Sequence, residues 1–276
     1  MNIVDIIKEA LRIGRTHKSL WLFGFLVGLS TPGVGGGGGG GGGPPAEAVA
    51  AEPGRMVLVV LVGCLLVLGF VILKLVSTGA LIEGVKRARE NRSLTVREGF
   101  REGWAHWGVL FRVAVVYFVI NAVSVALLVG LTLLAGRAFG PAGFALVGIP
   151  AVIAGVPWLV TTYVWQAFAE RIAVLENRRA IDAIRKARLF LHGRLQHGLK
   201  IAVAGFLGVV LISAVGAAVV LPVGGVLAVS SPLWGIGPSI AVGVVTLLPV
   251  VFVIFAFIGI MTSSVWTIGY LTQVER

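Results

Sequence analysis

The sequence predicts an all-α membrane protein: a polytopic six-transmembrane-helix bundle, in a pattern that suggests three repeats of an amphipathic helix plus a membrane hairpin. Three observations predict this fold: apolar runs of membrane-spanning length, basic residues confined to alternate connections, and a motif that recurs three times. Of the 276 residues, 57% are hydrophobic and 13% charged, against about 25% charged in a typical soluble domain. Because a chain this apolar needs lipid as its solvent, we treat residues 1–276 as a single integral membrane domain.

Six apolar runs carry the predicted spans, since a helix needs about 20 mostly apolar residues to cross a bilayer. The first run is short and gives way to glycine after Pro32, so its helix is expected to be tilted or partly re-entrant. Prolines inside the last three runs should kink or break their helices. The spans are expected at residues 19–33, 56–82, 107–135, 142–169, 199–228 and 238–270, with these prolines at Pro150, Pro157, Pro222 and Pro249.

A glycine-rich segment, residues 33–54, separates the first two spans. Its centre is the unbroken tract Gly35–Gly43. Glycine has no side chain to bury and loses the most backbone entropy on ordering, so we expect a flexible outer loop. A phosphate-binding loop would need a Lys-Ser or Lys-Thr pair at the start of a helix, and no such pair follows the tract.

The basic residues predict the orientation in the membrane. All of the 23 lysines and arginines except Arg55 and Arg137 fall in four segments that flank alternate spans. Because Lys and Arg in short loops mark the cytoplasmic side, we expect a cell (inner) membrane protein with both termini in the cytoplasm. One face then carries the whole net charge of +11. Residues 83–106 and 170–198 should form basic cytoplasmic interfacial helices.

A short motif recurs before each odd-numbered span. Its copies, EALRIGR, EGFREGW and DAIRKAR, share an acid, a small residue, a large apolar residue and an arginine. On a helix the acid and the arginine are three residues apart and lie on one face, which is typical of an amphipathic interfacial helix. A second echo, ENR, occurs at residues 90–92 and 176–178. The repeated acid and arginine positions are Glu9 and Arg12, Glu98 and Arg101, and Asp182 and Arg185.

Polar residues inside the spans are the candidate functional residues, because lipid makes them costly. Asn121 lies deep in the third predicted span, and Thr162, Gln166 and Glu170 share one helical face of the fourth. They could form a polar path through the bundle. The alternative, which we favour, is hydrogen bonding between helices.

The sequence predicts no catalytic constellation, cofactor or metal site. No pair of its four histidines has the three- or four-residue spacing of a helical metal site. The single cysteine, Cys64, lies in an apolar run, so we expect a buried and inert thiol. The positive charge flanks membrane spans and is explained by anionic lipid headgroups, so no nucleic-acid partner is expected.

Two stretches, SLWLFGFLVGLS before the glycine tract and ERIAVLENRRAIDAIRKARLFLHGR before the fifth span, carry a resemblance. Together they resemble a broad family of uncharacterised bacterial multi-pass membrane proteins, related to the membrane domain fused to some glycerophosphodiester phosphodiesterases. The resemblance implies a membrane location. It carries over no catalytic residue, because the acidic and histidine ligands of the soluble phosphodiesterase domain have no counterpart in this sequence.

These observations favour a non-enzymatic protein that acts as scaffold or accessory to another membrane component. The alternative is a small-solute transporter or channel. Its expected partners are membrane lipid, with anionic headgroups at the cytoplasmic face, and a membrane protein. A continuous polar cavity reaching Asn121 or Gln166 would favour transport, whereas a dry core packed with small residues would favour the scaffold.

Overall fold

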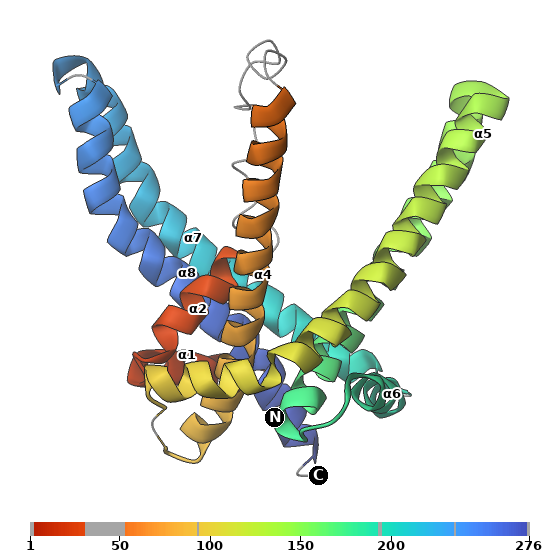
Figure 1. Cartoon of the computed structure of the whole chain (residues 1–276), viewed down its shortest axis with the longest axis horizontal. Coiled ribbons are helices and arrows are strands. Elements are labelled where there is room, and N and C mark those ends of the chain that lie inside the picture. Colours follow the sequence, from red (N-terminus) through yellow and green to blue (C-terminus); the bar gives the residue numbers. More distant parts are fainter. Residues whose placement is uncertain (1–2, 31–52, 93, 193–194, 235, 275–276) are drawn as a thin grey trace. The chain divides into compact units, whose positions relative to one another are not determined.

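The computed structural model describes residues 3–30, 53–92, 94–192, 195–234 and 236–274. These residues form only helices and short connections, which confirms the predicted all-α class (Figure 1). Four of the helices, α4, α5, α7 and α8, are long and apolar enough to cross a membrane. The helices are α1 (Ile3–Thr16), α2 (Leu20–Leu29), α4 (Pro53–Arg89), α5 (Val96–Leu175), α6 (Ala180–Leu191), α7 (Leu195–Trp234) and α8 (Ile236–Val274).

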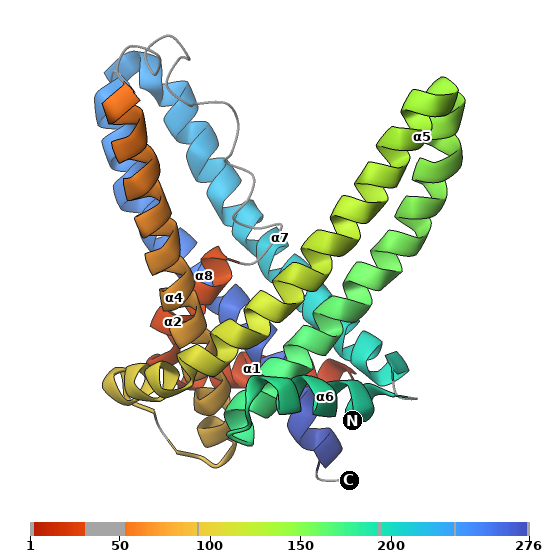
Figure 2. The same ribbon diagram turned by 45° about the vertical axis from the view of Figure 1, so that its right-hand side comes forward.

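Helix α5 is a hairpin with two helical arms. Its 80 residues would extend about 120 Å if straight, several times the hydrocarbon thickness of a bilayer. Gly140 interrupts it with a backbone φ of 65° and ψ of −154°, a conformation open to glycine and strained for other residues. Beyond Gly140 the chain turns back, and the two arms run side by side (Figure 2). Two of the predicted spans, 107–135 and 142–169, therefore lie in one continuous element.

We expected the prolines to kink or break their helices, and none of the helices ends at these prolines. Helix α5 continues through Pro150 and Pro157, α7 through Pro222 and α8 through Pro249. A proline inside a helix removes one backbone hydrogen bond, and neighbouring helices or local adjustment can compensate for that loss in a membrane protein. The one break inside α5 falls at Gly140, where φ is positive.

The helix at the first predicted span, α2, is much shorter than the helices that contain the other five predicted spans. Helix α2 has ten residues, which at 1.5 Å per residue is about 15 Å, or half the hydrocarbon thickness. Most of the predicted glycine-rich loop, residues 33–52, lies outside the described residues, and its last two residues, Pro53 and Gly54, open α4.

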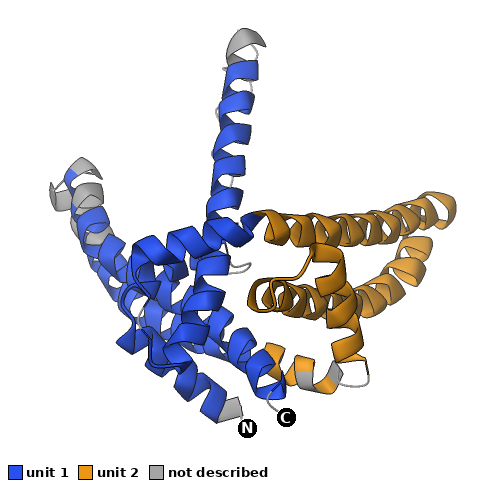
Figure 3. Ribbon diagram, turned by 60° about the horizontal axis from the view of Figure 1, so that its bottom comes forward, with its two compact units in different colours: residues 1–107, 203–276 blue, residues 108–202 orange. Residues whose placement is uncertain are grey.

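The chain divides into two compact units (Figure 3). Unit 1 contains residues 1–107 and 203–276, and unit 2 contains residues 108–202. Helices α5 and α7 each contribute to both units. Unit 2 holds most of the α5 hairpin, all of α6 and the first residues of α7.

Glycines let α2 and α8 cross at backbone contact in unit 1. A Cβ added at Gly24 or Gly28 would meet the carbonyl oxygen of Ala256 or Phe255, and one added at Gly259 would meet that of Gly24. Gly24 and Gly28 are four residues apart, the spacing through which membrane helices approach closely. Two other residues of α2, Leu20 and Phe23, are buried on α4 and α5, where they contact Gly84 and Gly99.

Helix α4 has two halves in different surroundings. The large apolar side chains between Val57 and Phe70 are 39–69% exposed, whereas those between Leu75 and Val85 are at most 6% exposed. The first half is therefore exposed and apolar, which is consistent with insertion in a membrane, and the second half belongs to the protein core. Cys64 lies in the first half and is exposed, so the expectation of a buried thiol was wrong. An apolar run alone does not distinguish a lipid-facing helix from a buried one.

We expect Gly259→Ala to destabilise the fold by about 1–3 kcal/mol, because the added methyl group overlaps the Gly24 carbonyl. The apparent melting temperature of the purified protein in detergent should fall. Gly69→Ala is the matched control, because nothing lies within 4 Å of a Cβ at that position. Equal melting temperatures for the two variants would show that α2 and α8 are not in backbone contact.

Candidate functional site

One hydrogen bond joins the arms of the α5 hairpin through two of the predicted residues. The Thr162 hydroxyl of the returning arm donates to Asn121 Oδ1 of the first arm at 2.8 Å. Thr162 is 1% exposed. A second bond between the arms lies nearby, where Trp158 Nε1 donates to the Ser124 hydroxyl at 3.0 Å. Asn121 is therefore paired across the hairpin, as expected for interhelical bonding.

The other two predicted residues form a chain with a buried arginine. Gln166 Nε2 donates to Glu170 Oε1 at 3.0 Å, and the other carboxylate oxygen accepts from Arg171 Nη1 at 3.1 Å. Arg171 Nη1 also donates to the carbonyl of Ala167 at 2.8 Å. Burying a charge is costly unless it is paired and hydrogen-bonded, and Glu170 supplies the pairing here.

Sequence reasoning missed the role of Arg171. It was assigned to the basic cytoplasmic surface, but it is 4% exposed. Its position next to Glu170, at the boundary between an apolar run and a basic segment, was the available signal. Tyr117 was also missed. Its hydroxyl is buried, and neither it nor Arg171 Nε has a hydrogen-bond partner among the described residues.

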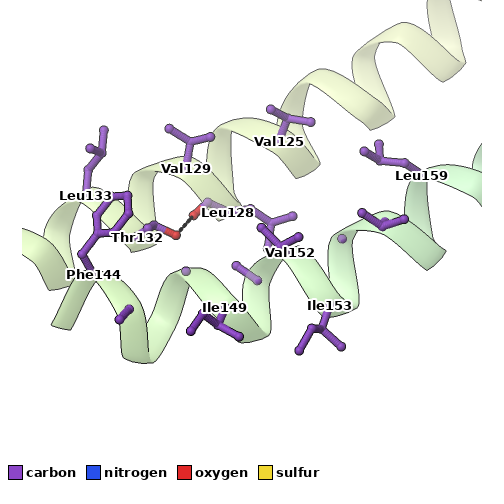
Figure 4. A pocket seen from close by; sticks show the side chains of 15 residues that line it. Val125, Leu128, Val129, Thr132, Leu133, Phe144, Ile149, Val152, Ile153 and Leu159 are labelled. Atoms are coloured by element: carbon purple, nitrogen blue, oxygen red, sulfur yellow. Dashed lines mark hydrogen bonds between the residues drawn. The ribbon is translucent and has the colours of Figure 1, made fainter. Parts of the chain in front are cut away.

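The hairpin carries an open apolar groove of about 830 Å³ between its arms (Figure 4). Leu133 and Phe144 lie at one end and Leu159 at the other. Thr132 contributes the polar side chain seen in the groove, and its hydroxyl is bonded to the Leu128 carbonyl at 2.8 Å. The lining does not include Asn121, Thr162, Gln166 or Glu170. The groove is thus suited to hydrocarbon and does not extend the polar cluster.

The residues of the threefold motif lie on three helices and have different partners. Glu9 on α1 pairs with Arg89 of α4 at 3.3 Å, rather than with Arg12. Glu98, in the first turn of α5, accepts a hydrogen bond from the backbone N–H of Thr95 at 3.1 Å, which lowers the pKa of Glu98. The motif therefore occurs on helices of very different length and does not repeat one interaction. Arg12, Arg101, Asp182 and Arg185 are exposed.

The ENR segments adopt the same backbone conformation at two helix ends. Asn91 follows α4 with φ 57°, and Asn177 follows α5 with φ 50°; they are the non-glycine residues with positive φ among those the structure describes. Asparagine is, after glycine, a common residue in this left-handed position at a helix C-terminus. In each copy the arginine pairs with the glutamate, at 3.6 Å in residues 90–92 and 2.8 Å in residues 176–178.

Many of the carboxylates in the basic segments are already paired. In unit 1, Arg87 bridges Glu83 and Glu102, at 3.2 Å to each. In unit 2, Lys186 approaches Glu176 to 2.6 Å, while Arg188 lies 5.0 Å from the centre of the Trp165 ring. The exposed cations of these segments include Lys8, Arg12, Arg15, Lys18, Arg97, Arg101, Arg179 and Arg185.

The carboxylate of the polar cluster is engaged by its neighbours. Glu170 is occupied by Gln166 and Arg171, and within the described ranges no group of three His, Cys, Asp or Glu side chains could hold a metal ion. No family model, curated protein or solved structure matches the chain. The structure itself defines the class: an all-helical protein with several helices able to span a membrane.

We expect Glu170→Gln to cost about 3–5 kcal/mol of stability, because it leaves the buried Arg171 charge without its carboxylate. The matched control is Glu176→Gln, which weakens ion pairs to the half-exposed Arg178 and Lys186 and should cost at most about 1 kcal/mol. Thermal unfolding in detergent measures both losses. A control that loses as much as Glu170→Gln would contradict the special role of the buried pair.

Proposed function

We propose that this chain is a six-pass inner-membrane protein with cytoplasmic termini, acting as a non-enzymatic scaffold or accessory of another membrane component. The observation that carries the proposal is the contrast within the α5 hairpin. Its polar side chains are bonded to one another, and the groove between its arms is apolar. Such a hairpin offers surfaces for lipid and protein rather than a route for water.

Two observations support six passes. Helix α5 supplies two antiparallel arms, each long enough to cross, in addition to α4, α7 and α8. The sixth pass would be α2 together with the residues that follow it, since α2 itself reaches only about halfway. An even number of passes puts all four basic segments on one side, which the positive-inside rule favours.

The exposed cations support a role in contact with a partner. Because carboxylates such as Glu83 and Glu176 are paired within the chain, exposed arginines such as Arg101 and Arg185 remain available. Such side chains attract acidic protein segments or anionic headgroups. Arg101 lies near the start of α5, and Arg185 lies on the short helix α6.

Two buried polar groups without hydrogen-bond partners among the described residues favour the rival function, a small-solute transporter or channel. The Tyr117 hydroxyl and Arg171 Nε are buried polar groups with no partner in the described part of the chain, and unpaired polar groups are a feature of water-lined paths. Asn121 is bonded to Thr162 and Gln166 to Glu170, so we rank this function second. Membership of the family that the sequence resembles stays a prediction.

The orientation can be tested by thiol labelling in intact cells. In a Cys64→Ser background, a membrane-impermeant reagent should label Gly39→Cys, in the glycine tract, and leave Arg179→Cys unlabelled until the cells are opened. Arg179 is exposed after the second ENR segment, so its access depends on the side of the membrane. Labelling of Arg179→Cys alone would overturn the proposed topology.

The scaffold can be tested by affinity purification from native membranes. We expect a membrane protein to co-purify with the wild type and to decrease in the double variant Arg101→Gln, Arg185→Gln. Arg137→Gln, at the tip of the hairpin, is the control for loss of an arginine elsewhere and should retain the partner. Recovery of lipid and the protein alone would contradict the scaffold, and solute uptake by proteoliposomes lost in Asn121→Leu would establish the rival.

A further inference from the structure

A second apolar groove, of about 620 Å³, lies in unit 1 where α1 meets α7 and α8. Its floor is the contact between Gly216 and Ile254, where a Cβ on the glycine would come within 2.7 Å of the isoleucine side chain. Its walls are partly exposed valines: Val215 and Val219 from α7, and Val253 from α8. Because Gly216 has no side chain, α7 can approach α8 closely, and the groove lies over this contact.

The register of α7 against α8 sets the length of this groove. Gly208 faces Met261 and Gly216 faces Ile254, so the two helices run antiparallel with little change of register. The α7 side of the groove extends from Leu211 to Val219, which is about 12 Å of helix. This is far shorter than a membrane-spanning helix, at about 30 Å, but suits a hydrocarbon chain.

Helix α1 places a cation at one end of the groove. Leu11 and Arg15 line it there, and Arg15 is exposed. The neighbouring residue Gly14 packs on the Phe257 ring, with 3.3 Å from its would-be Cβ to the ring. The Gly14 carbonyl also accepts a hydrogen bond from Trp21 Nε1 at 2.8 Å. These contacts hold the end of α1 against α8, so the position of Arg15 is set by packing.

The charge of Arg15 is not neutralised within the described chain. No carboxylate among the described residues forms an ion pair with it, and the nearby acid of its own helix, Glu9, is bound to Arg89. A guanidinium matches the geometry of phosphate oxygens. The groove therefore offers apolar walls and, at one end, the positive charge of Arg15. A single amphiphilic ligand with an anionic headgroup would match both.

We propose that this groove is a binding site for one phospholipid with a net negative headgroup. Its phosphate binds Arg15, and one acyl chain lies between α7 and α8 along Val215, Val219 and Val253. A free anion would make no use of the apolar walls, and a partner helix would extend well beyond the 12 Å furrow. The amphipathic character of α1, with Lys8, Arg12 and Arg15 exposed, places the headgroup at the membrane interface.

Lipid titration of the full-length protein in detergent, followed by native mass spectrometry, tests the site. The ligands are phosphatidylglycerol and phosphatidylcholine with identical acyl chains. For the wild type we expect tighter binding of phosphatidylglycerol. Arg15→Gln should weaken it about fivefold, the loss expected for one basic residue at a membrane surface, and should leave phosphatidylcholine nearly unchanged. Val253→Trp, which fills the groove, should reduce the binding of both lipids.

Lys8→Gln is the matched control, because Lys8 is an exposed cation of the same helix that does not line the groove. Its lipid binding should equal that of the wild type. If Lys8→Gln and Arg15→Gln lose the same affinity, the preference comes from general surface charge and the site is refuted. Unchanged binding in Val253→Trp would also refute it. Val219→Trp, on the opposite wall, replaces Val253→Trp if that variant does not fold.

Discussion

Backbone contact between α2 and α8 is the interaction around which the buried part of unit 1 is organised. In lipid there is little hydrophobic force to hold helices together, so close packing and hydrogen bonds must do so. Gly24, Gly28 and Gly259 bring the two backbones together. Leu20 and Phe23 of α2 are buried against Gly84 of α4 and Gly99 of α5. The same device recurs where a Cβ at Gly103 of α5 would meet the Val76 carbonyl of α4. Small residues thus decide where these helices touch.

Unit 2 is held together differently. Its two arms are bonded through side chains, Thr162 with Asn121 and Trp158 with Ser124. A polar pair in a low-dielectric environment is favourable when both partners are satisfied. Glycine contributes here as well, because Gly140 permits the reversal between the arms and a Cβ added at Gly143 would meet the Ala135 carbonyl. Unit 2 therefore combines side-chain hydrogen bonds between its arms with close contacts at glycine.

The sequence indicated the class of fold and the polar residues well, because both depend on local composition. Apolar runs predict helices, and Thr162, Gln166 and Glu170 share a face through helical periodicity alone. The hydrogen-bond partners of these residues were harder to predict from the sequence. That Asn121 bonds Thr162 depends on the register of the α5 hairpin, which a pattern of apolar residues does not specify. The burial of Arg171 likewise follows from packing, since its neighbours in the sequence are typical of a basic interfacial segment.

We expected the prolines to kink or break their helices, and the breaks did not occur, for a related reason. Helix rules derived from propensity describe a chain in water, where a lost hydrogen bond is readily replaced by solvent. In lipid the remaining backbone bonds have no such substitute, so helix persists through Pro150, Pro157 and Pro249. The repeated ENR segment, by contrast, corresponds to a structural feature, the end of a helix. Both copies end a long helix with asparagine in the left-handed conformation.

The exposure of α4 between Val57 and Phe70 has a consequence for how this protein can change over time. Side chains that meet only acyl tails are selected for apolarity and not for shape, so leucine, isoleucine and valine are interchangeable there. Positions such as Ala80 and Leu81, which are fully enclosed, must fit their neighbours. We therefore expect substitutions between apolar residues to be tolerated more readily in the exposed half of α4 than in its enclosed half.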